Sequence, residues 1–142
     1  MGETLSAKDA YAIGQAFGTL VLQAEPRGRV CVGRDGRLSS PELEGALVEG
    51  LLSTGAGVVS IGLGPTPMLY FAQKLMGAAG AIQVTGSHNP PDHNGFKMML
   101  CNKPFFGEAI PTRTRWGSSR RPWPARGLTS GWPSTATATA WA

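Results

Sequence analysis

The residues with the clearest chemical potential lie close together between Gly80 and Lys97. Ser87 offers a hydroxyl nucleophile, and Gly86 before it lets a ligand approach the backbone closely. His88 and Lys97 can supply a proton or a positive charge to the same place. A string of Gly, Ser, Asn, Asp and Pro is also typical of an ordinary turn. Residue types alone therefore leave two interpretations open, a reactive serine loop or a plain connection.

Arg34 and Arg37 form a second candidate group, one on each side of an Asp-Gly turn. Guanidinium groups bind phosphate through paired N–H donors, so both residues are candidate phosphate ligands. The alternative is a scaffold role in which Arg34 pairs with Asp35 or Glu42. Both interpretations stay open at this point.

The elements that must position these residues follow an α/β order. Apolar spacing predicts helices over 5–24, from Ser40 to Gly55 and from Thr66 to Gly77, and strands over 29–33, 57–62, 81–84 and 96–101. Helices between successive strands imply right-handed crossovers and a largely parallel sheet. The loop of about ten residues before the last strand is too short for a helical crossover, so that strand is expected to pair antiparallel.

Helix starts and apolar faces are also predicted by pattern. Ser6 and Asp9 indicate a near capping box, and Ser40 and Thr66 are expected to cap the next two helices because proline follows each. The residues expected on the buried faces are Leu43, Leu47, Val48, Leu51 and Leu52 in the second helix and Met68, Ala72, Leu75 and Met76 in the third.

The serine stretch also carries a long motif. Thr85–Lys97 reads Thr-Gly-Ser-His-Asn-Pro-Pro-Asp-x-Asn-Gly-Phe-Lys and resembles the active-site serine loop of the α-D-phosphohexomutases, the phosphomannomutase/phosphoglucomutase family. Gly33–Ser39 and Gly62–Pro67 match further family segments. The resemblance covers roughly residues 2–110. It implies the family's first domain over residues 1–108, a three-layer α/β domain whose mixed, mostly parallel sheet has helices on both faces. The family's Tyr-Asp-Ile-Arg-Gly segment does not precede it, so this domain is expected to be incomplete at its N-terminus.

The resemblance implies roles for single residues. Ser87 would be the phosphoserine and, through its phosphate, a ligand of Mg²⁺. Lys97 would be an acid/base and charge partner, although a solvated strand lysine is the simpler alternative, and His88 would support the site. Asn89 joins Arg34 and Arg37 as a candidate phosphate-binding residue, and as a turn residue it could instead brace the loop.

The implied activity is that of an isomerase acting as an intramolecular phosphotransferase in carbohydrate metabolism. It would interconvert hexose 1-phosphate and hexose 6-phosphate through a hexose 1,6-bisphosphate, with a phosphosugar as partner and Mg²⁺ as cofactor. The family's metal loop, Asp-Gly-Asp-Gly-Asp-Arg, does not occur in this chain. The alternative expectation is therefore a catalytically inactive fragment of such an enzyme. Glucose and mannose remain equally possible sugars.

Composition excludes some other classes. The chain has 142 residues, 42% of them hydrophobic, and no long apolar run, so no membrane span is expected. Two cysteines, Cys31 and Cys101, fall in predicted strands and read as reduced core thiols of a cytoplasmic protein. The net charge of +4 comes from the last residues: 1–110 hold eight basic and nine acidic residues, a net of −1. A nucleic-acid partner is not expected.

Residues 109–142 differ in texture and are expected to form an unstructured tail. They contain five arginines, four tryptophans and no acidic residue, a composition that GC-rich DNA gives in a wrong reading frame. One permitted set of codons for Gly127–Ala142, read in a shifted frame, resembles the family's metal loop. We therefore expect out-of-frame translation here, the alternative being a genuine disordered basic tail.

Overall fold

The computed structural model describes residues 5–105 as three helices and five strands in the α/β order that the sequence predicts. The expected tail at 109–142 and its reading frame lie outside these residues. The elements are α1 (Ala7–Ala24), β1 (Arg29–Arg34), α2 (Ser40–Ser53), β2 (Gly57–Leu63), α3 (Thr66–Met76), β3 (Gly80–Val84), β4 (Phe96–Leu100) and β5 (Lys103–Phe105).

The sheet has the order β2-β1-β3-β4-β5. β1 pairs parallel with both β2 and β3, while β4 runs antiparallel to β3. The mixed, mostly parallel sheet predicted for the first four strands is thus confirmed. Helical crossovers join the parallel strands, and the short serine loop leaves an antiparallel return as the available pairing for β4.

The strand β5 was not predicted. It follows a two-residue turn, Cys101-Asn102, in which both residues have positive φ, 50° and 61°. Such a turn suits the right-handed twist of a hairpin. The prediction that Cys101 is a core thiol within a strand was wrong, because the turn places it at the surface, whereas Cys31 is fully buried.

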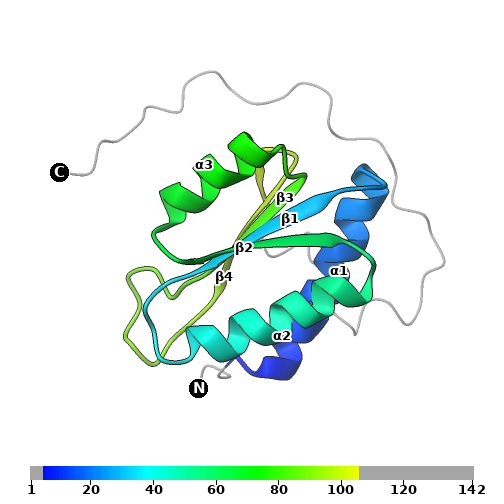
Figure 1. Ribbon diagram of the computed structural model, residues 1–142. Coiled ribbons are helices and arrows are strands. Elements are labelled where there is room, and N and C mark those ends of the chain that lie inside the picture. Colours follow the sequence, from blue (N-terminus) through cyan, green and yellow to red (C-terminus); the bar gives the residue numbers. More distant parts are fainter. Residues whose placement is uncertain (1–4, 106–142) are drawn as a thin grey trace, which may run out of the picture. The chain divides into compact units, whose positions relative to one another are not determined.

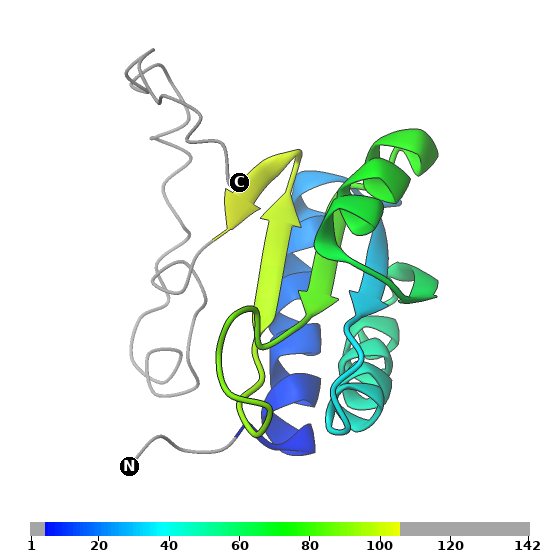
Figure 2. The same ribbon diagram turned by 90° about the vertical axis from the view of Figure 1, so that its left-hand side faces the viewer.

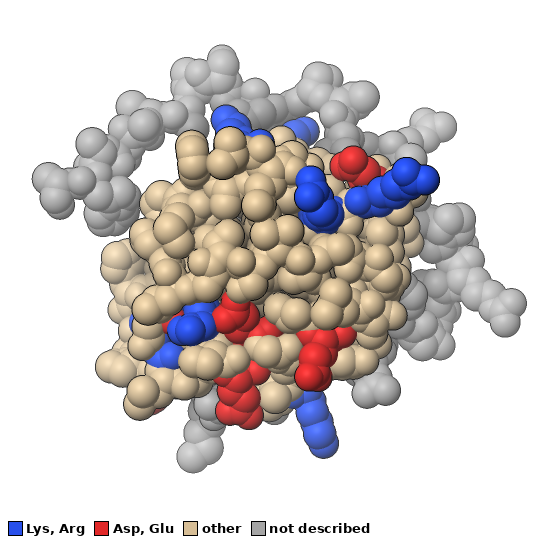
Figure 3. All heavy atoms as spheres, viewed as in Figure 1, with Lys and Arg blue, Asp and Glu red and all other residues tan. Residues whose placement is uncertain are grey.

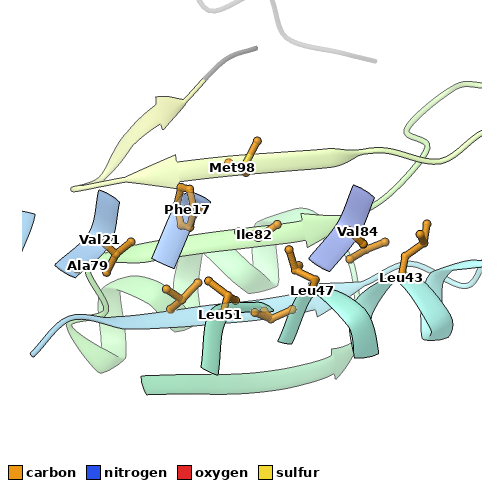
Figure 4. Close-up of a cluster of buried hydrophobic side chains, with 12 residues drawn as sticks. Phe17, Val21, Leu43, Leu47, Leu51, Ala79, Ile82, Val84 and Met98 are labelled. Atoms are coloured by element: carbon orange, nitrogen blue, oxygen red, sulfur yellow. The ribbon is translucent and has the colours of Figure 1, made fainter. Parts of the chain in front are cut away.

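Helices cover both faces of the sheet, as Figure 1 shows with α3 above it and α1 and α2 below. The larger core lies between α1, α2 and the sheet, where side chains such as Phe17, Leu47 and Leu51 pack towards Ile82 (Figure 4). A smaller cluster on the other face joins Leu69 of α3 to the strands. The three-layer prediction is confirmed. None of the helices in residues 5–105 combines the length and hydropathy that a membrane crossing requires.

The helices α2 and α3 begin at Ser40 and Thr66 as predicted, but only α1 has the predicted side-chain cap. The Ser6 side chain accepts a hydrogen bond from the backbone N–H of Asp9, and the Asp9 carboxylate accepts one in return from the N–H of Ser6. The caps predicted at Ser40 and Thr66 were wrong, since both are the first residues inside their helices. The Ser40 hydroxyl instead donates to Asp35 at 2.6 Å, so this serine serves the loop before the helix.

The buried face of α3 differs from the prediction by about one residue. Leu69 and Gln73 are buried, whereas Met68, Leu75 and Met76 are exposed. Gln73 takes a core position because its amide donates to the carbonyl of Ala78 at 3.4 Å, which partners a buried polar group. Periodicity counts apolar residues only, so a hydrogen-bonded glutamine shifts the apparent phase. In α2, Leu52 is likewise exposed, contrary to the prediction.

Glycines set the close approach of α1 and α2. A Cβ on Gly50 would meet the carbonyl oxygen of Tyr11, and one on Gly14 would meet that of Leu47. The two helix backbones touch at these points, so neither helix can accept a larger residue without moving.

We therefore predict that Gly50→Ala destabilises the protein, by about 1–3 kcal/mol, because the added methyl group forces the helices apart. Gly45→Ala in the same helix is the matched control, since a Cβ there meets nothing within 4 Å. Because alanine has a higher helix propensity than glycine, Gly45→Ala should raise the free energy of unfolding by about 0.5–1 kcal/mol. Urea unfolding of the full chain measures both. Equal midpoints for the two variants would contradict the packing argument.

Candidate functional site

The candidate site is formed by two loops that meet at one end of the sheet. β1 and β3 are parallel neighbours, so the loop 35–39 after β1 and the loop 85–95 after β3 leave the same edge. Figure 2 shows both loops at the lower end of the sheet. Carboxyl ends of strands are where open α/β sheets bind ligands. The fully buried β3 gives the serine loop a rigid base.

Ser87 lies exposed on the second loop, with Lys97 beside it. Its φ of 53° is in the left-handed region, which is uncommon for a residue with a side chain. The Lys97 Nζ donates to the Ser87 Oγ at 3.2 Å. Lys97 reaches it because β4 pairs antiparallel with β3, placing Lys97 opposite Gln83. The structure thus brings two predicted catalytic residues into hydrogen-bond contact.

His88 and Asn89 are exposed next to Ser87. The backbone N–H of Asn89 donates to the carbonyl of Gly86 at 3.0 Å, which closes a turn. Neither side chain has a hydrogen-bond partner among residues 5–105. Both lie near enough in sequence to serve the site, and their roles stay predictions.

The two arginines have separate surroundings. The Arg34 Nε lies 2.9 Å from a Glu44 carboxylate oxygen, so its partner is neither Asp35 nor Glu42. Arg37 crosses to the serine loop, where its Nη1 donates to the carbonyl of Pro90 at 2.6 Å. Both guanidinium groups are thus held by protein acceptors, and phosphate binding by either stays a prediction.

The Asp35 carboxylate connects the two loops through hydrogen bonds. It accepts hydrogen bonds from the Ser40 hydroxyl (2.6 Å), the Arg37 Nε (3.1 Å) and the backbone N–H of Gly86 (3.2 Å). Burial acts to raise the pKa of Asp35, but hydrogen bonds from Ser40, Arg37, Thr85 and Gly86 outweigh it and lower the pKa below its ordinary 3.8. From the sequence, Asp35 is expected only as a possible ion-pair partner of Arg34. Its position in a turn at the end of a parallel strand was the available signal.

Asn94 anchors the other end of the serine loop. Its Nδ2 donates to the hydroxyls of Ser39 and Ser40 at 3.0 and 2.8 Å, and its Oδ1 accepts from the N–H of Gly95. Ser40 therefore contacts both Asp35 and Asn94. The loop is fixed to the start of α2 at two points.

The charges around the site are of both signs. A pocket of about 480 Å³ lies between the loops, lined by Asp35, Gly36, Arg37, Leu38, Asn89 and Pro91. On the face seen in Figure 3, acidic and basic side chains are interspersed and do not gather into one large basic patch. Attraction of an anion to Ser87 then depends on nearby cations, of which Lys97 contacts the Ser87 hydroxyl.

The described residues do not complete a metal site. No three His, Cys, Asp or Glu side chains gather within residues 5–105 in a way that could hold a metal ion. Asp35, the carboxylate nearest in the network, already accepts hydrogen bonds from four donors: the backbone N–H groups of Arg37 and Gly86, the Arg37 Nε and the Ser40 hydroxyl. A Ser87 phosphate alone does not make the hard-oxygen set that Mg²⁺ requires.

The fold is that of an α/β/α domain with a serine and a lysine in contact at the carboxyl end of its parallel strands. Residues 1–111 match the family model described as phosphoglucomutase/phosphomannomutase, alpha/beta/alpha domain I. The chain therefore belongs to the phosphoglucomutase/phosphomannomutase family, which confirms the predicted resemblance.

Individual relatives agree with this assignment. The chain is 46% identical over 112 residues to a phosphomannomutase/phosphoglucomutase of Pseudomonas aeruginosa and to a phosphoglucomutase of Neisseria meningitidis; each match covers 78% of this chain and 24% of the relative. A crystal structure of a phosphoglucomutase/phosphomannomutase family protein from Burkholderia thailandensis is 49% identical, with a TM-score of 0.68, over 78% of this chain and 26% of that one. The chain thus spans about a quarter of the length of these relatives.

We predict that Asp35→Asn lowers the free energy of unfolding near neutral pH by about 1–3 kcal/mol, because buried donors lose their charged acceptor. Since folding lowers the pKa of Asp35, its contribution is present above pH 3.8 and is lost as pH falls through the folded value. The wild-type and variant stabilities should converge in acid. Asp92→Asn is the control, because Asp92 is exposed and its side chain, among residues 5–105, bonds the adjacent His93 alone. Urea titrations across the pH range test this, and parallel curves for wild type and D35N would contradict it.

Proposed function

We propose that this chain supplies the phosphoserine domain of a phosphohexomutase, in which Ser87 carries the phosphoryl group exchanged with a hexose phosphate. The observation that carries the proposal is the contact of 3.2 Å between the Lys97 Nζ and the Ser87 Oγ on an exposed loop. Family membership of residues 1–111 supports it. The substrate class is a phosphosugar.

The proposed step breaks the bond between phosphorus and the Ser87 Oγ and forms one to a sugar hydroxyl oxygen. Lys97 donates a hydrogen bond to the leaving Oγ, which stabilises its developing negative charge, and gives this oxygen a proton, while the proton of the attacking sugar hydroxyl passes to water. In the reverse transfer the same group takes the proton from the attacking Ser87 hydroxyl. We assign His88 and Asn89 a supporting role toward the transferring group, because both side chains lie exposed in the adjacent turn.

A second proposal is that the chain by itself does not turn over. Residues 5–105 provide a nucleophile and a cation but no carboxylate cluster for the Mg²⁺ that the family resemblance implies. Mg²⁺ and the hexose 1,6-bisphosphate therefore belong to the proposed whole enzyme, with metal ligands outside the described residues. The relatives are named for both glucose and mannose, so either sugar is compatible.

A cytoplasmic location remains part of the proposal. It is supported by the exposed thiol of Cys101, which suits a reducing compartment.

The proposed function is tested by grafting residues 1–111 in place of the matching segment of the Pseudomonas aeruginosa relative, which keeps the rest of its chain. The hybrid should interconvert hexose 1-phosphate and hexose 6-phosphate. Ser87→Ala should abolish turnover, and Lys97→Met should reduce it by about 10²-fold or more, the usual loss on removing a general acid–base group. A folded hybrid whose activity survives S87A would overturn the proposal.

The isolated chain, assayed with Mg²⁺ and a hexose 1,6-bisphosphate, should show no turnover above a protein-free blank. Its described residues hold no group that could replace the metal ligands. Turnover that the S87A substitution removes would contradict the proposed inactivity, while leaving the role of Ser87 intact.

A further inference from the structure

We infer that Arg37 is a positioning residue that holds the Ser87 hydroxyl against Lys97. The inference deepens the proposed function, on which it rests for the meaning of Ser87 as the phosphoryl carrier. It assigns Arg37 to the backbone of the serine loop, a role distinct from the phosphate contact that the sequence suggested.

Three carbonyl groups of the serine loop converge on the Arg37 side chain. The Arg37 Nη2 donates to the carbonyl oxygens of Ser87 (3.1 Å) and Asn89 (2.9 Å), and Nη1 donates to that of Pro90. Three carbonyl dipoles pointing at one place repel each other unless a cation lies between them. A planar guanidinium can satisfy all three at once, whereas an ammonium on a flexible stem cannot match that geometry.

The Arg37 guanidinium is itself anchored by Asp35. The Arg37 Nε donates to the same Asp35 carboxylate that accepts from the N–H of Gly86. Asp35 thus holds both the arginine and the residue before Ser87. The Arg37 side chain is only 14% exposed, so these bonds are partly shielded from water.

Gly86 is the matching part of this contact. A Cβ on Gly86 would meet the guanidinium carbon of Arg37 and the carbonyl oxygen of His93. The glycine therefore makes room for the arginine beneath the loop. A side chain at position 86 requires the Arg37 guanidinium, the loop backbone at His93 or both to shift.

Ser87 has an unusual backbone conformation, with a positive φ. Its left-handed backbone costs on the order of 1 kcal/mol for a residue with a Cβ, so it persists only where neighbours fix it. Arg37 holds its carbonyl, and the Thr85 hydroxyl accepts from its N–H at 3.0 Å. With both flanking peptide groups fixed, the Cα–Cβ bond has one direction, and Oγ meets Lys97. Release of the carbonyl lets φ relax to negative values, which turns Oγ away.

The test replaces the hydroxyl by a thiol, whose ionisation reports the neighbouring ammonium. Ser87→Cys is made in the full chain with Cys101→Ser, which removes the exposed native thiol and leaves the buried Cys31. The rate of alkylation by iodoacetamide is followed against pH. Lys97 should lower the pKa of the new thiol below its ordinary value of about 8.5.

Arg37→Lys keeps the positive charge and loses the planar fork. It should raise the pKa of the thiol towards the ordinary value and slow alkylation near neutral pH by about three- to tenfold, since one pKa unit changes the thiolate fraction up to tenfold. Lys97→Met should produce the same change, and R37K added to K97M should produce no further one. Gly86→Ala, which crowds the arginine and the His93 carbonyl from the other side, should disturb the same contact and change the profile in the same direction.

Arg29→Lys is the matched control. Arg29 also donates to a backbone carbonyl, that of Met76 at 2.9 Å, but it lies at the opposite end of β1 from the serine loop. R29K should leave the alkylation profile unchanged. Urea unfolding of each variant confirms that the compared proteins are folded.

Two results would overturn the inference. One is a profile that R37K and G86A both leave unchanged while they lower stability, which would make Arg37 a stabilising residue only. The other is a thiol that titrates at its ordinary value with Arg37 and Lys97 both present. Neither assay involves a phosphosugar, so failure here leaves the hybrid enzyme test intact. An inactive hybrid beside a lowered thiol pKa would instead refute the proposed function alone.

Discussion

Parallel pairing of β1 with β3 is the constraint on which the rest of the site depends. The register from Val30 opposite Gly80 to Arg34 opposite Val84 makes both strands end at the same level of the sheet. The loops that follow must then share one space. Each contact described between Asp35, Arg37 and the serine loop requires this register, because a strand inserted between them would separate the loops by about 5 Å more.

Where the two loops meet, their backbone N–H and carbonyl groups lie outside the hydrogen-bond pattern of the helices and the sheet. A buried or half-buried loop carries N–H and carbonyl groups that must find partners. In this protein Asp35 takes the N–H groups and Arg37 takes the carbonyls, so a single ion pair answers both needs. The same arrangement leaves Ser87 and Lys97 exposed to an incoming ligand. Rigidity and accessibility thus come from different residues of one loop pair.

Most of the fold could be predicted because each element carries its own local signal. Apolar runs bounded by glycine gave the strands, the capping box gave the start of α1, and Gly77, with φ of 59°, ended α3 as expected. The errors arose where a polar side chain of a helix takes a hydrogen-bond partner just outside that helix, five residues away. Gln73 turned the buried face of α3, and Ser40 served Asp35 in place of a cap.

The site divides in the same way between sequence and structure. The sequence by itself determined the motif around Ser87, the presence of Lys97 ten residues later and the α/β order that puts them on a loop and the next strand. Only the tertiary structure decided that the Lys97 ammonium meets the Ser87 hydroxyl and that Arg37 faces loop carbonyls. The reason is physical: the direction of a long side chain is set by the acceptors around it. The acceptor of Lys97 lies ten residues away and those of Arg37 some fifty residues away along the chain, and both sets are brought near by strand pairing, which local pattern does not contain.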